Sequence, residues 1–254
     1  MTEWLKIRNY RTFWVLLVLF VLCTIGVNYV FYETKSDSNM RQVSMLIGNP
    51  FSFPDIWQTV GYISSFLLFL PGLIVLILVT NEYNFRTHRQ NIIDGISRLD
   101  FAAAKIFVAV KLAVFATVLT FLIAVFMGLS GNTAFSVDNT VYLLYFFLQA
   151  LTYTLAGLLF GFLFKRSGIA IALYFIYLFF LKNILGFLAN HYLSNTGDYF
   201  PVKSADSLIP IPVFHNLTKS MFAQPNVTAL IICTLIYLFA FCLIVVKKFT
   251  AEDL

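Results

Sequence analysis

The sequence predicts an all-α integral membrane protein, and three observations support this fold class. Hydrophobic residues make up 60% of the 254-residue chain, and the mean hydropathy is +0.84, which is typical of a polytopic membrane protein. Six segments reach the roughly 20 apolar residues that a helix needs to cross a hydrocarbon layer about 30 Å thick. None of these segments alternates between apolar and polar residues, as the strands of a membrane barrel would. We therefore expect one transmembrane domain over residues 1–254.

The six expected spans are about residues 13–32, 62–80, 101–129, 141–164, 168–188 and 227–246. Basic residues precede the first span, as in a signal peptide, but its length and the lack of a cleavage motif before Glu33 favour a retained helix. Pro71-Gly72 is expected to kink or weaken the second span. All three cysteines lie in apolar runs, so they indicate neither a disulfide framework nor a metal site.

Lysine and arginine gather at one set of helix ends, which predicts the orientation of the chain. The larger set consists of Lys6, Arg8, Arg11, Arg86, Arg89, Arg98, Lys105, Lys111, Lys165, Arg166, Lys247 and Lys248. The smaller set consists of Lys35, Arg41, Lys182, Lys203 and Lys219. Because basic residues are enriched in cytoplasmic loops, we expect both termini and residues 81–100 in the cytoplasm of a bacterial inner membrane protein. The basic residues sit at membrane ends, so they do not indicate binding of nucleic acid.

Two segments outside the spans are expected to be helical. Residues 1–12 place Trp4 and Tyr10 among basic residues, which predicts an amphipathic helix at the membrane interface. Residues 189–226, on the outer side, contain four prolines but remain apolar for a solvated loop. We interpret this outer segment as short interfacial or re-entrant helices.

The third and fourth spans carry the small residues of close helix packing. In the fourth span, Gln149, Tyr153, Gly157 and Gly161 share one face at four-residue spacing. Gly157 and Gly161 predict a close approach of two helix backbones. A face that lines a transport pathway is the alternative interpretation, with Gln149 and Tyr153 as its polar residues. The third span has a stripe of alanines and one threonine: Ala109, Ala113, Ala116, Thr120 and Ala124.

Lys182 is the one charged residue well inside an apolar run. A buried charge within a membrane suggests a function, such as lining a pathway. It lies near the outer end of the fifth span, however, so an ammonium that reaches the headgroups is an equal alternative.

Residues 81–100 form a polar segment between the second and third spans, and they carry six of the charged residues that make up only 11% of the chain. Phe85, Ile92, Ile96 and Leu99 recur at helical spacing and predict one apolar face. Glu82 precedes Arg86 by four residues, which predicts an ion pair along a helix.

The end of this polar segment carries a turn and a new helix start. Asp94-Gly95 predicts the end of the amphipathic helix, and Ser97 to Asp100 resembles a capping box that begins the third span. A passive connection would need only a few residues. The length and charge of this segment therefore favour a recognition surface for a soluble partner.

The polar segment also contains a pattern of residue types: Glu82-Tyr83, Thr87-x-Arg89-Gln90-Asn91, Asp94-Gly95, Ser97-Arg98, Phe101 and Lys105. This pattern resembles the coupling region of ABC type-2 permeases, the membrane subunits of ATP-binding-cassette exporters. The family has an acidic residue, Thr-x-Arg, Ser-Arg and a lysine in the next helix, and this chain has each. Elsewhere the resemblance is one of layout.

The resemblance implies that residues 81–100 dock on a separate nucleotide-binding ATPase, and that two permeases, identical or paralogous, pair with two ATPases. The interface would consist of Glu82, Tyr83, Phe85, Arg86, Thr87, Arg89, Gln90, Asn91, Asp94, Gly95, Ser97 and Arg98. ATP and magnesium would bind the partner, since this chain has no G-x-x-x-x-G-K-[ST] phosphate loop. We expect no catalytic residue, cofactor or metal on the chain itself, because its three histidines are scattered. A membrane scaffold without transport and an intramembrane enzyme are the alternative functions, and no motif identifies a substrate.

Overall fold

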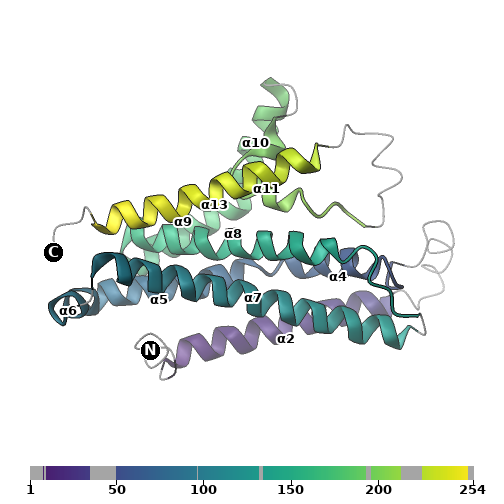
Figure 1. Ribbon diagram of the computed structural model, residues 1–254, viewed down its shortest axis with the longest axis horizontal. Coiled ribbons are helices and arrows are strands. Elements are labelled where there is room, and N and C mark those ends of the chain that lie inside the picture. The colour runs from purple at the N-terminus through teal and green to yellow at the C-terminus, as the bar shows by residue number, and fades with distance from the viewer. Residues whose placement is uncertain are drawn as a thin grey trace.

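The protein folds into a bundle of long helices (Figure 1). The computed structural model describes residues 8, 10–34, 50–95, 97–131, 134–192, 196–212 and 225–250, and for His88 and Arg89 it describes the backbone alone. Within these residues there is no β-strand. Most of the helix expected in residues 1–12, and residues 213–224 of the outer segment, lie outside the described ranges.

Helices of membrane-spanning length appear at each of the six predicted positions. Five are α2 (Arg11–Thr34), α7 (Arg98–Ser130), α8 (Val141–Phe164), the pair α9 (Ser167–Ile176) and α10 (Lys182–Tyr192) joined through a π-helix (Tyr177–Leu181), and α13 (Val227–Thr250). The sixth consists of α4 (Ile56–Ser65) and α5 (Phe69–Asn84), which are bent by 43° at their junction. Shorter elements are α6 (Thr87–Ile93), a 3₁₀ turn (Gly197–Tyr199) and α11 (Lys203–Asp206). The structure confirms the predicted all-α membrane fold.

Helix α8 lies at the centre of the bundle. It packs against α4, α5, α7, α9 and α13, while α2 covers the opposite face of α4, α5 and α7 (Figure 1). Helix α7 meets its neighbours through the predicted stripe of small residues, and all five of these side chains are fully buried. Large apolar side chains remain exposed on α2, α7, α9, α10 and α13, as expected of surfaces that face lipid tails.

The bend in the second span falls a few residues before the predicted kink at Pro71-Gly72. Helix α4 ends at Ser65, and Leu68 donates its backbone N–H to the carbonyl of Ser65, three residues back. Pro71 lies in the first turn of α5. A proline ring clashes with the carbonyl four residues earlier, so the bend belongs on the N-terminal side of Pro71.

Glycines bring α5 and α8 into backbone contact. A Cβ atom on Gly157 would overlap the carbonyl group of Gly72, and one on Gly72 would overlap the carbonyl of Tyr153 and the hydroxyl of Tyr174. Gly161 lies one turn further along α8, where a Cβ would be 3.2 Å from the side chain of Val79. These three glycines set the separation of the two helices.

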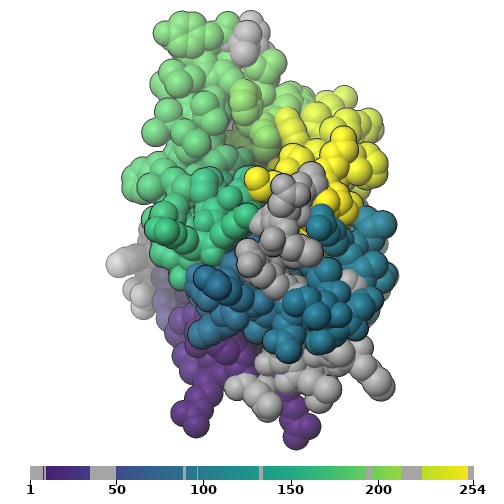
Figure 2. All heavy atoms as spheres, turned by 90° about the vertical axis from the view of Figure 1, so that its left-hand side faces the viewer, coloured from purple at the N-terminus to yellow at the C-terminus, as the bar shows by residue number. Residues whose placement is uncertain are grey.

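One end of the bundle carries α6, and we call it the α6 end. The start of α2, the loop between α8 and α9 and the end of α13 lie at the same end, because the intervening spans run antiparallel (Figure 1). Figure 2 views the molecule from this side, with the blue segment that joins α5, α6 and α7 between purple α2 and yellow α13. The opposite end carries the starts of α4 and α8, while α10 projects from the side of the bundle with α11 beside it (Figure 1).

Candidate functional site

Two residues with positive φ separate α6 from the spans on either side. Arg86 has φ 55° and precedes α6, and Gly95 has φ 93° and follows it. The side chain of Ser97 then accepts a hydrogen bond from the Asp100 N–H (3.0 Å), and its hydroxyl donates to the Asp100 carboxylate (2.6 Å). Ser97 is thus the N-cap of α7, as the sequence predicts. In a capping box the side chain three residues later bonds to the backbone N–H of the cap residue, whereas the Asp100 carboxylate bonds to the Ser97 side chain.

The prediction that Phe85, Ile92, Ile96 and Leu99 form one apolar face of a helix is wrong. Phe85 lies beyond the end of α5, Ile92 lies on α6 and Leu99 lies on α7, while Ile96 is outside the described residues. The backbone leaves helical geometry at Arg86 and Gly95. Helical spacing in the sequence therefore does not correspond to one face in space.

The structure divides the residues predicted for the ATPase interface into an exposed group and a partly buried group. Exposed are Phe85, Arg86, Thr87, Gln90, Asp94, Gly95 and Ser97. Partly buried are Glu82, Tyr83, Asn91 and Arg98. The side chain of Arg89 lies outside the described part of the chain. Phe85 and the neighbouring Ile93 are 75% and 82% exposed, so this surface combines polar groups with two large apolar side chains.

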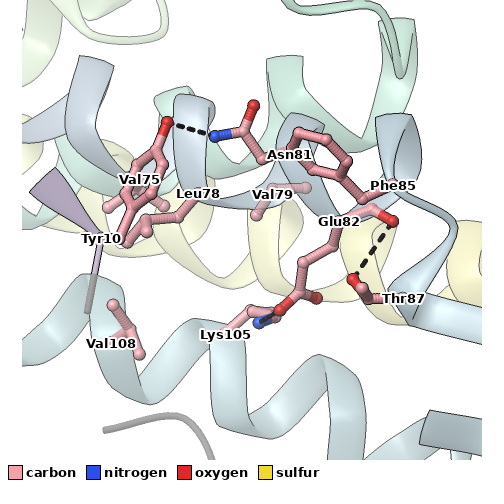
Figure 3. A pocket seen from close by; sticks show the side chains of 10 residues that line it. All are labelled: Tyr10, Val75, Leu78, Val79, Asn81, Glu82, Phe85, Thr87, Lys105 and Val108. Atoms are coloured by element: carbon pink, nitrogen blue, oxygen red, sulfur yellow. Dashed lines mark hydrogen bonds and ion pairs between the residues drawn. The ribbon is translucent and has the colours of Figure 1, made fainter. Parts of the chain in front are cut away.

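Glu82 forms an ion pair with Lys105 and connects α5 to α7 (Figure 3). The Glu82 carboxylate and the Lys105 ammonium are 2.6 Å apart, and the two side chains are only 11% and 4% exposed. The ammonium also lies 5.0 Å from the centre of the Phe101 ring. Just beyond, the Thr87 hydroxyl donates to the Glu82 carbonyl at 3.4 Å, which ties the first residue of α6 to the end of α5.

The ion pair replaces the one predicted between Glu82 and Arg86, which does not form in the described residues. Helix α5 ends at Asn84, and Arg86 has left-handed backbone geometry. The side chains of Glu82 and Arg86 are therefore no longer one helical turn apart, and the Glu82 carboxylate pairs with Lys105.

The Glu82–Lys105 pair lies at one wall of a cavity of about 220 Å³ (Figure 3). Its other lining is mainly apolar side chains of α5 and α7. Tyr10, just before α2, also lines it, and the Asn81 amide donates to the Tyr10 hydroxyl. The start of α2, the end of α5 and the first turns of α7 therefore meet beside α6.

Arg98 connects this end of the bundle to the last helix. Its guanidinium donates to the backbone carbonyl of Thr250 at 2.7 Å. The rings of Phe101 and Phe249 stack with their centres 4.5 Å apart. Arg98 thus connects α7 to α13, and its partly buried side chain offers little surface to a partner subunit.

A second polar cluster lies near the middle of α8 and unites the three residues predicted as a possible pathway. The Lys182 ammonium contacts the Asp206 carboxylate at 2.5 Å and the Tyr153 hydroxyl at 2.7 Å. The other carboxylate oxygen of Asp206 accepts from the Tyr153 hydroxyl (3.0 Å) and the Gln149 amide (2.9 Å). Lys182 is 9% exposed, so its ammonium binds a carboxylate inside the protein and does not extend toward headgroups.

Irregular backbone surrounds this second cluster. The π-helix Tyr177–Leu181 ends next to Lys182, and π-helical turns occur often at functional sites. The α4–α5 break lies across from it, since Phe66 and Phe69 line the same cavity as Lys182. This cavity measures about 420 Å³.

Asp206 and Lys105 are the two site residues whose contacts the sequence did not reveal. Asp206 lies 24 positions after Lys182, in the outer segment expected to form short interfacial or re-entrant helices. A buried lysine needs a counter-ion, and that requirement was the one available signal. Among the described residues, no group of His, Cys, Asp and Glu could hold a metal ion.

Comparison with known proteins identifies the family of the chain. The family model described as ABC-2 family transporter protein matches residues 1–181, which cover α2 to the π-helix and include the whole α6 region. A search of curated proteins found no match to the chain. Members of this family are multi-pass permease subunits that normally have no catalytic function of their own. The chain therefore belongs to the ABC-2 transporter family as its membrane-spanning permease subunit.

Proposed function

We propose that this permease exports its substrate with energy from a separate ATPase subunit that docks on the exposed surface of α6. The proposal rests on one observation: the exposed α6 lies between α5 and α7 in the chain, and the largely buried Glu82–Lys105 pair joins these two spans to each other. A subunit that moves α6 must therefore also move the inner ends of α5 and α7. The ATPase would hold ATP and magnesium.

The charge distribution supports the same orientation. The α6 end carries most of the lysines and arginines of the chain, which favours its placement in the cytoplasm, where an ATPase has access to ATP. Lys247 and Lys248 in the last turn of α13 lie at this end as well. A dimer of permeases, identical or paralogous, would provide two such surfaces for two ATPases.

The docking surface has a specific chemistry. Arg86, Gln90 and Asp94 supply charged and amide groups, and Phe85 and Ile93 supply apolar area. Buried apolar anchors with a polar rim are typical of protein interfaces. Glu82, in this proposal, transmits movement between α5 and α7 and does not contact the ATPase.

The test is co-purification from cells that express the permease with its neighbouring reading frames. We expect a subunit with a phosphate-loop motif, and ATPase activity, to accompany the wild-type chain. Ile93→Ser should remove both, because it removes an anchor that is 82% exposed and therefore supports little of the fold. Val137→Ser is the matched control, since Val137 is 66% exposed at the opposite end. Full transport by a permease purified without an ATPase would refute the proposal and favour another mechanism.

A further inference from the structure

The cavity beside Lys182, which we call the α11 cavity, has an excess of positive charge. Its charged lining residues are Lys182, Lys203 and Asp206. Asp206 accepts three hydrogen bonds, from Lys182, Tyr153 and Gln149. The carboxylate is thus occupied, and a cationic ligand would have to displace Lys182 to reach it.

Lys203 is the cation that remains available in this cavity. No ion pair is formed by Lys203 with any residue that the structure describes. Its aliphatic stem lies alongside α10, because a Cβ on Gly186 would be 3.8 Å from the Lys203 Cε. Lys203 also lines the cavity, so the ammonium at the end of this stem is within reach of a ligand there.

Gln149 supplies the cavity with a hydrogen-bond acceptor, its amide oxygen, to which no described group donates. Its amide nitrogen donates to Asp206, which fixes the orientation of the amide, since a carboxylate can only accept. The amide oxygen is buried and has no hydrogen-bond partner in the described part of the protein. Gln149 is 2% exposed, and a buried polar atom of this kind is uncommon unless a ligand or water completes it.

The rim of the α11 cavity is apolar and faces the outside of the bundle. Phe66 and Phe179 both line it, and they are 63% and 49% exposed. In a membrane-spanning bundle, exposed aromatic side chains of this kind meet lipid tails. A ligand could therefore place a hydrocarbon chain along the rim and its polar group inside.

From these features we propose that the α11 cavity binds an anionic amphiphile whose headgroup also carries a hydroxyl. The anion would pair with Lys203, the hydroxyl would donate to the Gln149 amide oxygen, and the acyl chain would lie along Phe66 and Phe179. The inference deepens the proposed function, because it names the substrate class of the permease. Binding can nevertheless be measured without any ATPase.

The test is lipid titration of the purified full-length chain, followed by native mass spectrometry. Three probes with equal acyl chains separate the contributions: phosphatidylglycerol (anion and hydroxyls), phosphatidylmethanol (anion alone) and phosphatidylcholine (zwitterion). We expect affinity to fall in that order. Lys203→Ala should weaken binding of phosphatidylglycerol about tenfold, as for loss of one charged hydrogen bond, and Lys203→Arg should retain it. Lys111→Ala, an exposed lysine on α7, is the control and should bind as the wild type does.

Other outcomes overturn the inference. Equal affinity for all three lipids, or unchanged binding by Lys203→Ala, would exclude charge recognition at this cavity. A competition experiment measures whether millimolar inorganic phosphate competes for the cavity as strongly as phosphatidylglycerol does. Equal competition would show that the site binds a free anion and not an amphiphile. Since the Ile93→Ser experiment tests the α6 end alone, failure here would leave the ATPase proposal standing.

Discussion

The Glu82–Lys105 ion pair offers the sharpest test of how the α6 end is built. The two charged groups are 2.6 Å apart, and their side chains are 11% and 4% exposed. Removing one partner takes the nearest opposite charge away from a group that is almost fully buried, which costs roughly 3–5 kcal/mol. Glu82→Gln and Lys105→Met should each lower stability by about that amount. The double variant should lose less than the sum, because neither charge remains.

Thermal unfolding of the purified chain in detergent micelles measures this effect. In a chain of this size, 1 kcal/mol corresponds to about 2–4 °C in Tm, so each single variant should unfold roughly 6–20 °C below the wild type. Lys111→Met is the matched control: it removes an exposed lysine from the same helix and should leave Tm unchanged. Strictly additive losses in the double variant would refute a direct interaction between the two residues.

Two further predictions concern the contact between α5 and α8 and the Lys182–Asp206 cluster. Gly157→Val should lower the free energy of unfolding by about 1–3 kcal/mol or more, because the new side chain meets the Gly72 backbone, which cannot rotate away. Gly168→Val is the control, since nothing lies within 4 Å of the new Cβ. It should lower the free energy of unfolding less in the same Tm measurement. Asp206→Asn should destabilise by roughly 1–3 kcal/mol, less than Glu82→Gln because Asp206 is 22% exposed; a Tm equal to that of Asp198→Asn would contradict a counter-ion role for Asp206.

The spans could be predicted from the sequence because length and hydropathy in a bilayer leave few alternatives. Each predicted span overlaps the observed helix, and the start of α7 follows from Ser97, whose cap uses neighbours only three residues away. Proline in the second span likewise indicated a bend, although the clash with an earlier carbonyl moved it toward α4. These signals are local, so a single sequence contains them.

The internal contacts of the two sites could not be predicted in the same way. Arg86 adopts positive φ although it is not glycine. The apolar residues of the polar segment therefore keep helical spacing in the sequence across a position where the helix ends. Lys105 and Asp206 meet their partners only after distant helices pack. The sequence predicted Arg86 as the partner of Glu82 and no partner for Lys182, whereas the packed helices bring Lys105 and Asp206 to them.

Helix α5 connects the two sites. It begins at the break whose Phe69 lines the α11 cavity, and it ends beside Glu82 and α6. Its 16 residues span about 24 Å, and the contact between Gly72 and Gly157 fixes it to α8 near its first turn. A force on α6 would therefore tilt α5 about this contact, and the displacement at its far end would fall on the α4–α5 break. The break adjoins the Lys182–Asp206 cluster, so the same tilt would alter the α11 cavity. In the proposed mechanism, this arrangement would give an ATPase docked at α6 a physical route to a ligand in the α11 cavity.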